Sequence, residues 1–220
     1  MFCPDDRIIY PESPLVKFDF GYLDTIMEGK HRPGHFNGVA TVVSKLFNIV
    51  KPDVAYFGQK DLQQFIMLRQ LVKDFSFDIK LVCCPIVREN DGLAISSRNI
   101  RLNIEARKIA PNIYKALVLG KNYVGRIGNP YSVEQVSNPF KNIFKDTKKK
   151  VKEFIFQFRG IELEYFEIVD GETLKTVKDI KNHHKIALCI AAHIGTIRLI
   201  DNLIIQLFCY PIFFVPSYLL

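Results

Sequence analysis

A strand–helix–strand pattern in the first half of the chain constrains the fold most strongly. Residues 53–58 (DVAYFG) form a short apolar run that ends at glycine, which is typical of a buried strand. Residues 61–75 place apolar side chains at helical spacing, and residues 77–87 form a second strand-like run. Two strands joined by one helix over about 35 residues must run parallel, with a right-handed crossover. Together with an amphipathic helix expected at 36–50, this pattern predicts an α/β domain over residues 1–101.

The second half of the chain has a different pattern. Helices are expected first, with a loop at 125–130 between them, and closely spaced strands follow. This order is typical of a smaller α+β domain, which we place at 102–207. Residues 208–220 then form an atypical apolar tail. The expected helices span 103–119 and 132–152, and the expected strands span 161–169, 185–192 and 196–205.

The composition of the chain is that of an ordinary globular protein. Of its 220 residues, 48% are hydrophobic and 24% are charged, so a disordered chain is excluded. The net charge of +7 suits an anionic partner, such as a nucleotide, a nucleic acid or an acidic metabolite. Part of this excess comes from six lysines between Lys141 and Lys152, which are typical of a solvated helix face. Because these lysines gather on one predicted helix, we do not expect a nucleic-acid partner.

The cysteines and the chain termini favour a cytoplasmic protein. The five cysteines form no CxxC pair and no metal-binding spacing, so we expect free thiols, no metal site and a reducing compartment. The N-terminal residues lack the basic and apolar regions of a signal peptide. Residues 202–220 carry no charge, but Pro211 and Pro216 would break a membrane-spanning helix there. We therefore expect a strand followed by an apolar extension rather than a membrane anchor.

A polar loop follows the first predicted strand, at the edge where parallel α/β sheets bind their ligands. Gly58 permits a tight turn and close approach of the backbone to a ligand. After Gln59, Lys60 offers a positive charge to phosphate, and Asp61 is expected to cap the next helix. Gln64 shares the helix face of Asp61 and carries an amide that both donates and accepts hydrogen bonds. Taken alone, this loop also fits a capped helix start with a surface lysine.

A second polar loop, from Val87 to Asn99, follows the second predicted strand. Asp91 and Gly92 indicate a turn, and residues 96–98 (Ser-Ser-Arg) present two hydroxyls, consecutive backbone N–H groups and a guanidinium. Such a cluster suits a polyphosphate, whose charge during adenylyl or phosphoryl transfer needs fixed donors. Helix N-caps have a similar sequence, so this loop alone decides little. Two such loops at one edge of a strand–helix–strand unit together predict a nucleotide site.

Two histidine motifs resemble the HxGH motif of class I nucleotidyltransferases. The first, from His31 to His35 (HRPGH), has an extra residue and a proline, and no hydrophobic strand precedes it. The second, from His193 to Gly195, lacks a second histidine and is expected between two strands. We therefore assign a catalytic role to neither motif.

Around the two loops, the sequence resembles the pantothenate synthetase (pantoate–β-alanine ligase) family. The resemblance rests on three ordered motifs and extends over residues 8–205. The motifs are MEGKHRPGHFNGVATVVSKLFNIVKPDVAYFGQKDLQQ, then PIVRENDGLAISSRNIRLNIEARKIAP, and finally AAHIGTIRLIDN.

The resemblance implies a fold, a reaction and a set of site residues. The fold would be a partial Rossmann-like parallel sheet, similar to class I nucleotidyltransferases, followed by a small α+β domain. The reaction would join (R)-pantoate to β-alanine through a pantoyl-adenylate, using ATP with Mg²⁺ and releasing AMP and diphosphate. A cytoplasmic homodimer would carry it out. Gln64 would hold pantoate, and ATP would contact Gly58, Gln59, Lys60, Asp61, Val87, Ile95, Ser96, Ser97 and Arg98.

The chain departs from the family pattern at its N-terminus. The family begins with a Rossmann half whose HxGH motif supplies the catalytic histidine, and Met1 falls partway into that pattern. We therefore expect a truncated chain in which the catalytic residue is unknown. Lys60, Ser96, Ser97 and Arg98 would play supporting roles. A catalytically inactive remnant that only binds nucleotide, or that pairs with another subunit, is the alternative.

Overall fold

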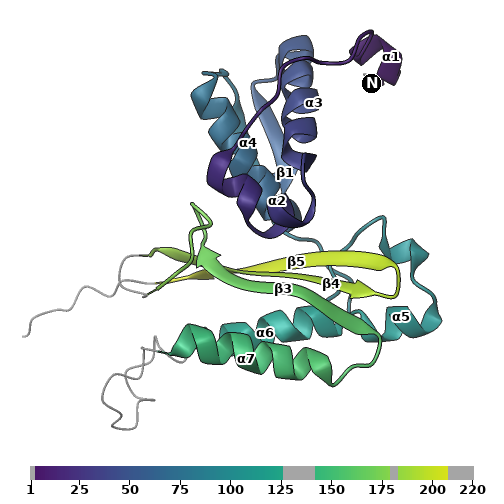
Figure 1. The fold of residues 1–220 in the computed structure, drawn as a ribbon, viewed down its shortest axis with the longest axis vertical. Coiled ribbons are helices and arrows are strands. Elements are labelled where there is room, and N and C mark those ends of the chain that lie inside the picture. Colours follow the sequence, from purple (N-terminus) through teal and green to yellow (C-terminus); the bar gives the residue numbers. More distant parts are fainter. Residues whose placement is uncertain (1–2, 126–141, 179–182, 208–220) are drawn as a thin grey trace, which may run out of the picture.

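The computed structural model describes residues 3–125, 142–178 and 183–207 and arranges them in two stacked units (Figure 1). The N-terminal unit runs from α1 to η3 and combines helices with a small parallel sheet. The C-terminal unit runs from α5 to β5 and combines an antiparallel sheet with three helices. Figure 1 shows the N-terminal unit seated on one face of the antiparallel sheet, while α6 and α7 cover the other face.

The N-terminal unit is built around two parallel strands, β1 and β2. Val54 pairs with Lys80 and Gly58 pairs with Cys84, so the two strands end at the same edge. The helix between them provides the crossover that the sequence predicted. The elements of this unit are α1 (Asp6–Ile9), η1 (Gly21–Thr25), α2 (Met27–His31), α3 (His35–Val50), β1 (Val54–Gly58), η2 (Gln59–Asp61), α4 (Leu62–Asp74), β2 (Lys80–Cys84) and η3 (Asn99–Arg101).

One face of this two-stranded sheet is covered by helices. Buried side chains of α3 and α4, including Phe47 and Leu68, pack with Ala55, Phe57 and Leu81 of the strands. Side chains alternate between the faces of a strand, so Tyr56 lies on the opposite face, where it is 68% exposed. Parallel sheets are usually covered on both faces. This sheet therefore has one covered face and one open face among the residues described.

The C-terminal unit is an antiparallel meander backed by helices. Its strand order is β3–β4–β5, and the β4–β5 turn passes through Gly195 in a left-handed conformation (φ 58°) that glycine adopts without strain. The elements of this unit are α5 (Ile104–Ile109), α6 (Asn112–Gly125), α7 (Ile143–Phe156), β3 (Ile161–Asp170), β4 (Lys185–Ile194) and β5 (Ile197–Gln206).

Both faces of the antiparallel sheet are buried. On one face, Leu188 and Ile190 join the main core with Leu117 of α6 and Val151 of α7. On the other face, an apolar cluster crosses to the N-terminal unit and includes Met27, Leu62, Ile66, Val169, Ala187 and Cys189. The N-terminal unit thus takes the place of a second helical layer. This packing is what brings the loop after β1 against β5.

The predicted α/β class and most of the predicted elements are confirmed. Helix 36–50 corresponds to α3, helix 61–75 to α4, and the three late strands to β3, β4 and β5. Three details were wrong. The strand predicted at 77–87 is limited to Lys80–Cys84, because Pro85 has no N–H to continue the ladder. The helix predicted at 103–119 is broken by Pro111 into α5 and α6. His193 lies inside β4 rather than between two strands.

Some expectations fall outside the described residues. These are most of the loop at 125–130, the first part of the helix at 132–152, the tail at 208–220 and the state of Cys209. The other four cysteines are free. Within the described ranges, no helix combines the length and apolar character needed to cross a membrane. The domain boundaries at 101 and 207 stay predictions.

Truncating a buried side chain of the main core is expected to destabilise the protein more than truncating an exposed one. Leu188 of β4 has no exposed surface and lies in the core that the sheet shares with α6 and α7, so Leu188→Ala should lower the free energy of unfolding by about 3 kcal/mol. Leu15 is 95% exposed, so Leu15→Ala should change it by less than about 0.5 kcal/mol. Urea unfolding followed by circular dichroism measures both values. Equal effects of the two substitutions would contradict this placement of the core.

Candidate functional site

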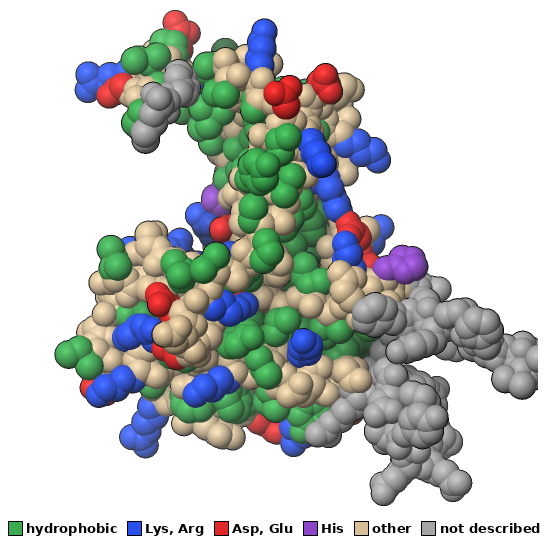
Figure 2. All heavy atoms as spheres, turned by 180° about the vertical axis from the view of Figure 1, so that it is seen from behind, with side chains coloured by type: hydrophobic (Ala, Val, Ile, Leu, Met, Phe, Trp, Pro, Cys, Tyr) green, Lys and Arg blue, Asp and Glu red, His purple; other side chains and the backbone are tan. Residues whose placement is uncertain are grey.

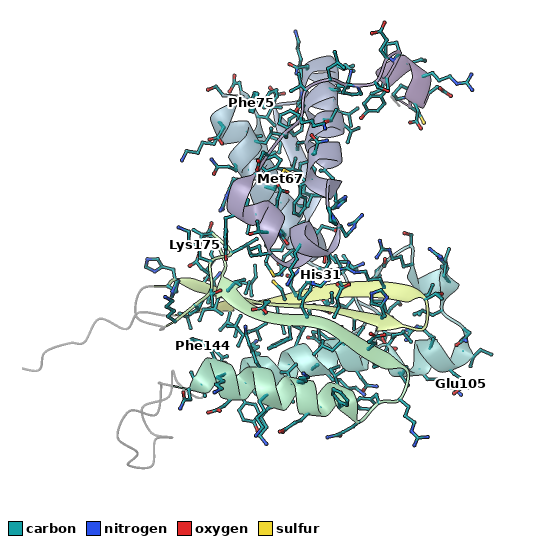
Figure 3. All side chains as sticks on the ribbon, in the orientation of Figure 1. His31, Met67, Phe75, Glu105, Phe144 and Lys175 are labelled. Carbon is teal, nitrogen blue, oxygen red and sulfur yellow. The ribbon has the colours of Figure 1, made fainter. Side chains whose placement is uncertain are left out.

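A narrow cleft of about 30 Å³ that opens to solvent lies where the N-terminal unit meets β5. Figure 2 shows the molecule narrowing between the two units, with charged side chains gathered at that waist. In Figure 3, the labelled His31 lies at the same junction, at the end of α2. The cleft is walled by α2, the first turn of α3, the start of α4 and the strands β3 to β5. Its polar lining comprises Glu28, Arg32, His35, Lys60, Asp61, Gln63, Gln64, Tyr165, Asp201 and Asn202.

The first predicted loop forms one wall of this cleft and is held against β5. The Asn202 side-chain amide donates hydrogen bonds to the carbonyl oxygens of Gln59 (2.9 Å) and Lys60 (3.0 Å). In return, Gln59 Nε2 donates to Asn202 Oδ1 at 3.0 Å. The turn after β1 is therefore fixed by a residue 142 or 143 positions later in the chain.

Lys60 brings a positive charge into the cleft. Burial lowers the pKa of its ammonium, an effect that the nearby carboxylates of Asp61 and Asp201 oppose and that Arg98 adds to. Its Nζ forms no hydrogen bond or ion pair with any residue that the structure describes. Lys60 is thus a half-buried cation available to an anion. Asp61 occupies the N-cap position of α4, as expected, but its carboxylate makes no cap hydrogen bond there and lines the cleft instead.

Two adjacent glutamines on α4 have different roles. Gln63 is buried, donates to the Leu23 and Ile26 carbonyl oxygens, and accepts a hydrogen bond from the Glu28 N–H. It therefore fixes α2 against α4. Gln64 also lines the cleft, but its amide forms no hydrogen bond with another described residue. As predicted, Gln64 shares this wall with Asp61, and its amide is free for a ligand.

The second predicted loop is anchored on the same strand. Arg88 donates to both carboxylate oxygens of Asp201, at 2.6 and 2.9 Å, and its guanidinium lies 4.0 Å from the ring centroid of Tyr114. A β-bridge between Arg88 and Ala94 closes the base of the loop. Burial raises the pKa of the Asp201 carboxyl, and the Arg88 guanidinium opposes that rise. Both polar loops thus depend on neighbouring residues of β5.

The Ser-Ser-Arg segment lies beside the cleft rather than in its lining. Ser96 Oγ accepts a hydrogen bond from the Arg98 N–H at 3.2 Å, and Arg98 Nη1 donates to the Arg198 carbonyl oxygen at 2.8 Å. Arg98 is nevertheless close enough to Lys60 to lower its pKa. Val87, Ile95 and Ser97 are exposed. The structure therefore brings Lys60, Asp61 and Gln64 together in the cleft lining and places Arg98 near Lys60. Val87, Ile95 and Ser97 lie outside that lining.

A network of charges that the sequence analysis did not single out joins the two units. Arg198 of β5 donates to both carboxylate oxygens of buried Glu28, at 2.9 and 2.7 Å, and also to Glu164 of β3. The Tyr165 hydroxyl donates to Glu28 Oε1 at 2.8 Å. Burial alone would raise the pKa values of Glu28 and Glu164, but hydrogen bonds from Arg198 lower both overall. Glu28 and Arg198 both lie within the family-like motifs, which was the signal available in the sequence.

The histidines differ in their surroundings. His35 lines the cleft, and its Nε2 lies 2.8 Å from Arg32 Nη1, so Nε2 must accept because a guanidinium can only donate. Burial and the Arg32 charge both lower the pKa of His35, which favours a neutral ring. His193 and His31 lie 3.3 and 3.5 Å from Glu164, outside the cleft lining. In the described part of the chain, no three His, Cys, Asp or Glu side chains form a metal-binding group.

Comparison with known proteins identifies the family. A sequence model of the pantoate–β-alanine ligase family matches residues 1–204. The chain belongs to this family. It is 47% identical over 207 residues to the pantothenate synthetase of Cytophaga hutchinsonii, covering 94% of this chain and 69% of that one. It is 43% identical over 202 residues to the pantothenate synthetase of Bacteroides fragilis, covering 92% and 66%.

Solved pantoate–β-alanine ligases have the same fold. The pantothenate synthetase of Thermus thermophilus superposes with a TM-score of 0.79 at 37% identity, covering 91% of this chain and 67% of that one. The ligase of Francisella tularensis, complexed with beta-gamma ATP and β-alanine, gives 0.61 at 33% identity, covering 90% and 61%. The chain thus spans roughly two thirds of the length of the pantoate–β-alanine ligases that it matches.

The charge network predicts how stability depends on acid. The pKa of Glu28 is lowered in the folded protein, so its ion pair stabilises the fold above the unfolded value of about 4.3 and is lost as pH falls through the folded value. Glu28→Gln should therefore cost about 3 kcal/mol at pH 7, and the difference from wild type should shrink below about pH 4. Urea unfolding between pH 3 and 7 measures this. Exposed Glu105→Gln is the control, and a pH-independent Glu28→Gln effect would contradict the assignment.

Proposed function

We propose that this chain acts in the ATP-dependent joining of (R)-pantoate to β-alanine, the reaction for which its family is named. The observation that carries the proposal is the grouping of Lys60, Asp61 and Gln64 on one wall of the cleft, with Arg98 close to Lys60. A free ammonium and a guanidinium suit a phosphate chain, and a free amide suits a hydroxy acid. The cleft therefore offers the two kinds of group that the two substrates need.

The ATP end of the site is assigned to the two polar loops. Lys60 enters from the first loop with no protein anion paired to it among the described residues, and Arg98 enters from the second with donors beyond the one bound to the Arg198 carbonyl oxygen. Ser96 and Ser97 add hydroxyls and backbone N–H groups beside Arg98. Exposed Val87 and Ile95 offer apolar surface to the adenine. Charge on the phosphates would be stabilised from both loops at once.

Asp61 is the residue that would hold Mg²⁺. This ion usually keeps several waters and binds through substrate phosphates and one or two carboxylates. The Asp61 carboxylate fits, because it lies on the cleft wall beside Lys60 and forms no hydrogen bond with any residue in the described ranges. When bound with ATP, the ion supplies neutralisation of phosphate charge.

Gln64 is assigned to pantoate. Its amide can accept from a hydroxyl and donate to a carboxylate, and both groups occur in pantoate. Gln64 lies in the first turn of α4, four residues after Lys60, and both side chains line the cleft. A pantoate carboxylate bound here would lie near the ATP phosphates.

The proposed reaction balances in two steps. In the first, a pantoate carboxylate oxygen attacks the α-phosphorus of ATP, the bond to diphosphate breaks, and pantoyl-adenylate forms. In the second, the β-alanine amine attacks the pantoyl carbonyl carbon, AMP leaves, and the amine gives up a proton. Lys60 and Arg98 stabilise charge in the first step. The second step also needs a proton acceptor.

A second candidate function is nucleotide binding without turnover. The observation that favours it is the hydrogen bond from Arg32 to His35, which occupies the accepting nitrogen of the one histidine in the described cleft lining. A ring held in this way cannot take a proton from β-alanine at that nitrogen. ATP binding would persist, because it depends on Lys60 and Arg98 instead.

The resemblance to the family also leads us to propose a homodimer in the cytoplasm. The four free cysteines that the structure describes suit a reducing compartment. Analytical ultracentrifugation of the purified chain tests the dimer.

Isotope exchange between diphosphate and ATP tests the first step. We expect pantoate-dependent exchange, together with AMP release that requires β-alanine. Lys60→Ala or Arg98→Ala should slow exchange about 100-fold, because each loses about 2–4 kcal/mol of charge stabilisation. Lys73→Ala, at the exposed end of α4, is the matched control and should behave as wild type. ATP binding without exchange or AMP release would favour the second candidate function.

Gln64→Leu tests the pantoate assignment. The substitution removes both amide functions but keeps a side chain of similar shape, so the KM for pantoate should rise at least about 10-fold while the KM for ATP stays near wild type. Steady-state kinetics with each substrate varied measures both values. Gln70→Leu, on an exposed part of the same helix, is the control. Equal changes in the two KM values would assign Gln64 a structural role only.

A further inference from the structure

Two adjacent polar residues are buried in β5, a strand that otherwise contributes to the core. Asp201 is 4% exposed and Asn202 is 2% exposed. Burying such groups costs free energy unless their hydrogen bonds are satisfied. Both are satisfied, and their partners belong to the two polar loops. Building on the function proposed above, we propose that Asp201 and Asn202 are positioning residues that set the spacing between the two nucleotide-binding loops.

The register of β5 places these two residues on opposite faces of the sheet. Asn202 pairs with Cys189, which belongs to the apolar cluster shared with the N-terminal unit. Asp201 pairs with Ile190, which belongs to the core shared with α6 and α7. Since successive side chains of a strand point to opposite faces, β5 holds one loop from each side.

On the first face, the Asn202 amide is used completely by the loop after β1. Both N–H donors bind backbone carbonyl oxygens, those of Gln59 and Lys60, and the amide oxygen accepts from the Gln59 side chain. With both donors occupied, Asn202 has none left for a substrate. Its contacts instead fix the backbone that carries the Lys60 side chain into the cleft.

On the other face, Asp201 holds Arg88, which lies at the start of the second loop. Besides its paired contact with Asp201, Arg88 donates to the carbonyl oxygens of Gly92 (3.0 Å) and Asn202 (3.2 Å). The Arg88 guanidinium therefore links β5 to the turn between Arg88 and Gly92. The aromatic ring of Tyr114 covers it and ties the same point to α6.

A third contact from β5 places the end of the second loop. Arg198 lies three residues before Asp201 on β5, and its carbonyl oxygen accepts a hydrogen bond from the Arg98 side chain at 2.8 Å. Lys60 and Arg98 come from loops separated in sequence, yet both are located by one short stretch of β5, residues 198–202. A phosphate chain bridging the two cations requires that separation, and a displacement of about 1 Å can cost about 100-fold in rate.

Local hydrogen exchange distinguishes positioning from general stabilisation. In the full chain without ligand, Asn202→Leu should increase exchange at the amides of 58–62 at least about 10-fold and leave 88–94 unchanged. Asp201→Asn should increase exchange at the amides of 88–94 and leave 58–62 unchanged, since it keeps the side-chain shape but weakens the pairing with Arg88. Gln206→Ala, at the exposed end of β5, is the matched control and should change neither segment. Uniformly faster exchange across the chain, or no change, would overturn the proposal.

Nucleotide affinity provides the second measurement. Calorimetry with a non-hydrolysable ATP analogue and Mg²⁺ should show binding weakened about 10- to 100-fold in Asn202→Leu and Asp201→Asn, with wild-type melting curves at the assay temperature. Lys60→Ala should weaken binding while leaving exchange at 58–62 as in wild type. If wild type fails to bind the analogue, the proposed function is wrong, and the exchange pattern still decides the loop positioning. Wild-type affinity in both β5 variants would overturn the proposal.

Discussion

The arrangement of the two units depends on the guanidinium of Arg198. It lies between two carboxylates, Glu28 from α2 and Glu164 from β3, that would repel each other without it. Removing these charges from water costs free energy, and close pairing with several hydrogen bonds offsets that cost. Because each contact is directional, the network allows one orientation of α2 over the sheet. Apolar packing within the cluster that includes Met27 and Cys189 is not directional, so it contributes attraction rather than alignment.

That alignment creates the cleft. Lys60 and Gln64 belong to one unit and Asn202 to the other, so neither unit alone encloses the space between them. The same strand, β5, carries Arg198 at the junction and Asn202 at the loop. The stability of the junction between the units and the geometry of the cleft therefore both depend on β5. A substitution on β5 that loosens the junction is expected to disturb the loops as well, whereas one on the exposed surface of α4 is not.

Local chemistry made much of this structure predictable from the sequence. Apolar spacing identified α3 and α4, and the strand–helix–strand rule gave the parallel pairing of β1 and β2. The placement of Gln64 on the same side of the helix start as Asp61 followed from helix geometry, and both residues line the cleft. The role of Asn202 did not, because its partners lie 142 and 143 residues away and no periodicity reports a contact over that distance. Asp61 shows a second limit of local prediction. Its residue type favours a cap hydrogen bond at the start of α4, but its carboxylate makes none and the residue lines the cleft instead.

The described cleft is better suited to stabilising charge than to moving protons. Its cations, Lys60 and nearby Arg98, are held by backbone contacts that β5 determines, which is the fixed arrangement that transfer to phosphorus requires. Its histidine has its accepting nitrogen bound to Arg32, and its pKa is lowered by burial and by that same charge. For His35 to accept a proton, Arg32 would first have to move away, for example to a substrate carboxylate. Anion binding and proton acceptance would then be coupled through the hydrogen bond between Arg32 and His35. A carboxylate that bound Arg32 would free His35 Nε2 to accept a proton.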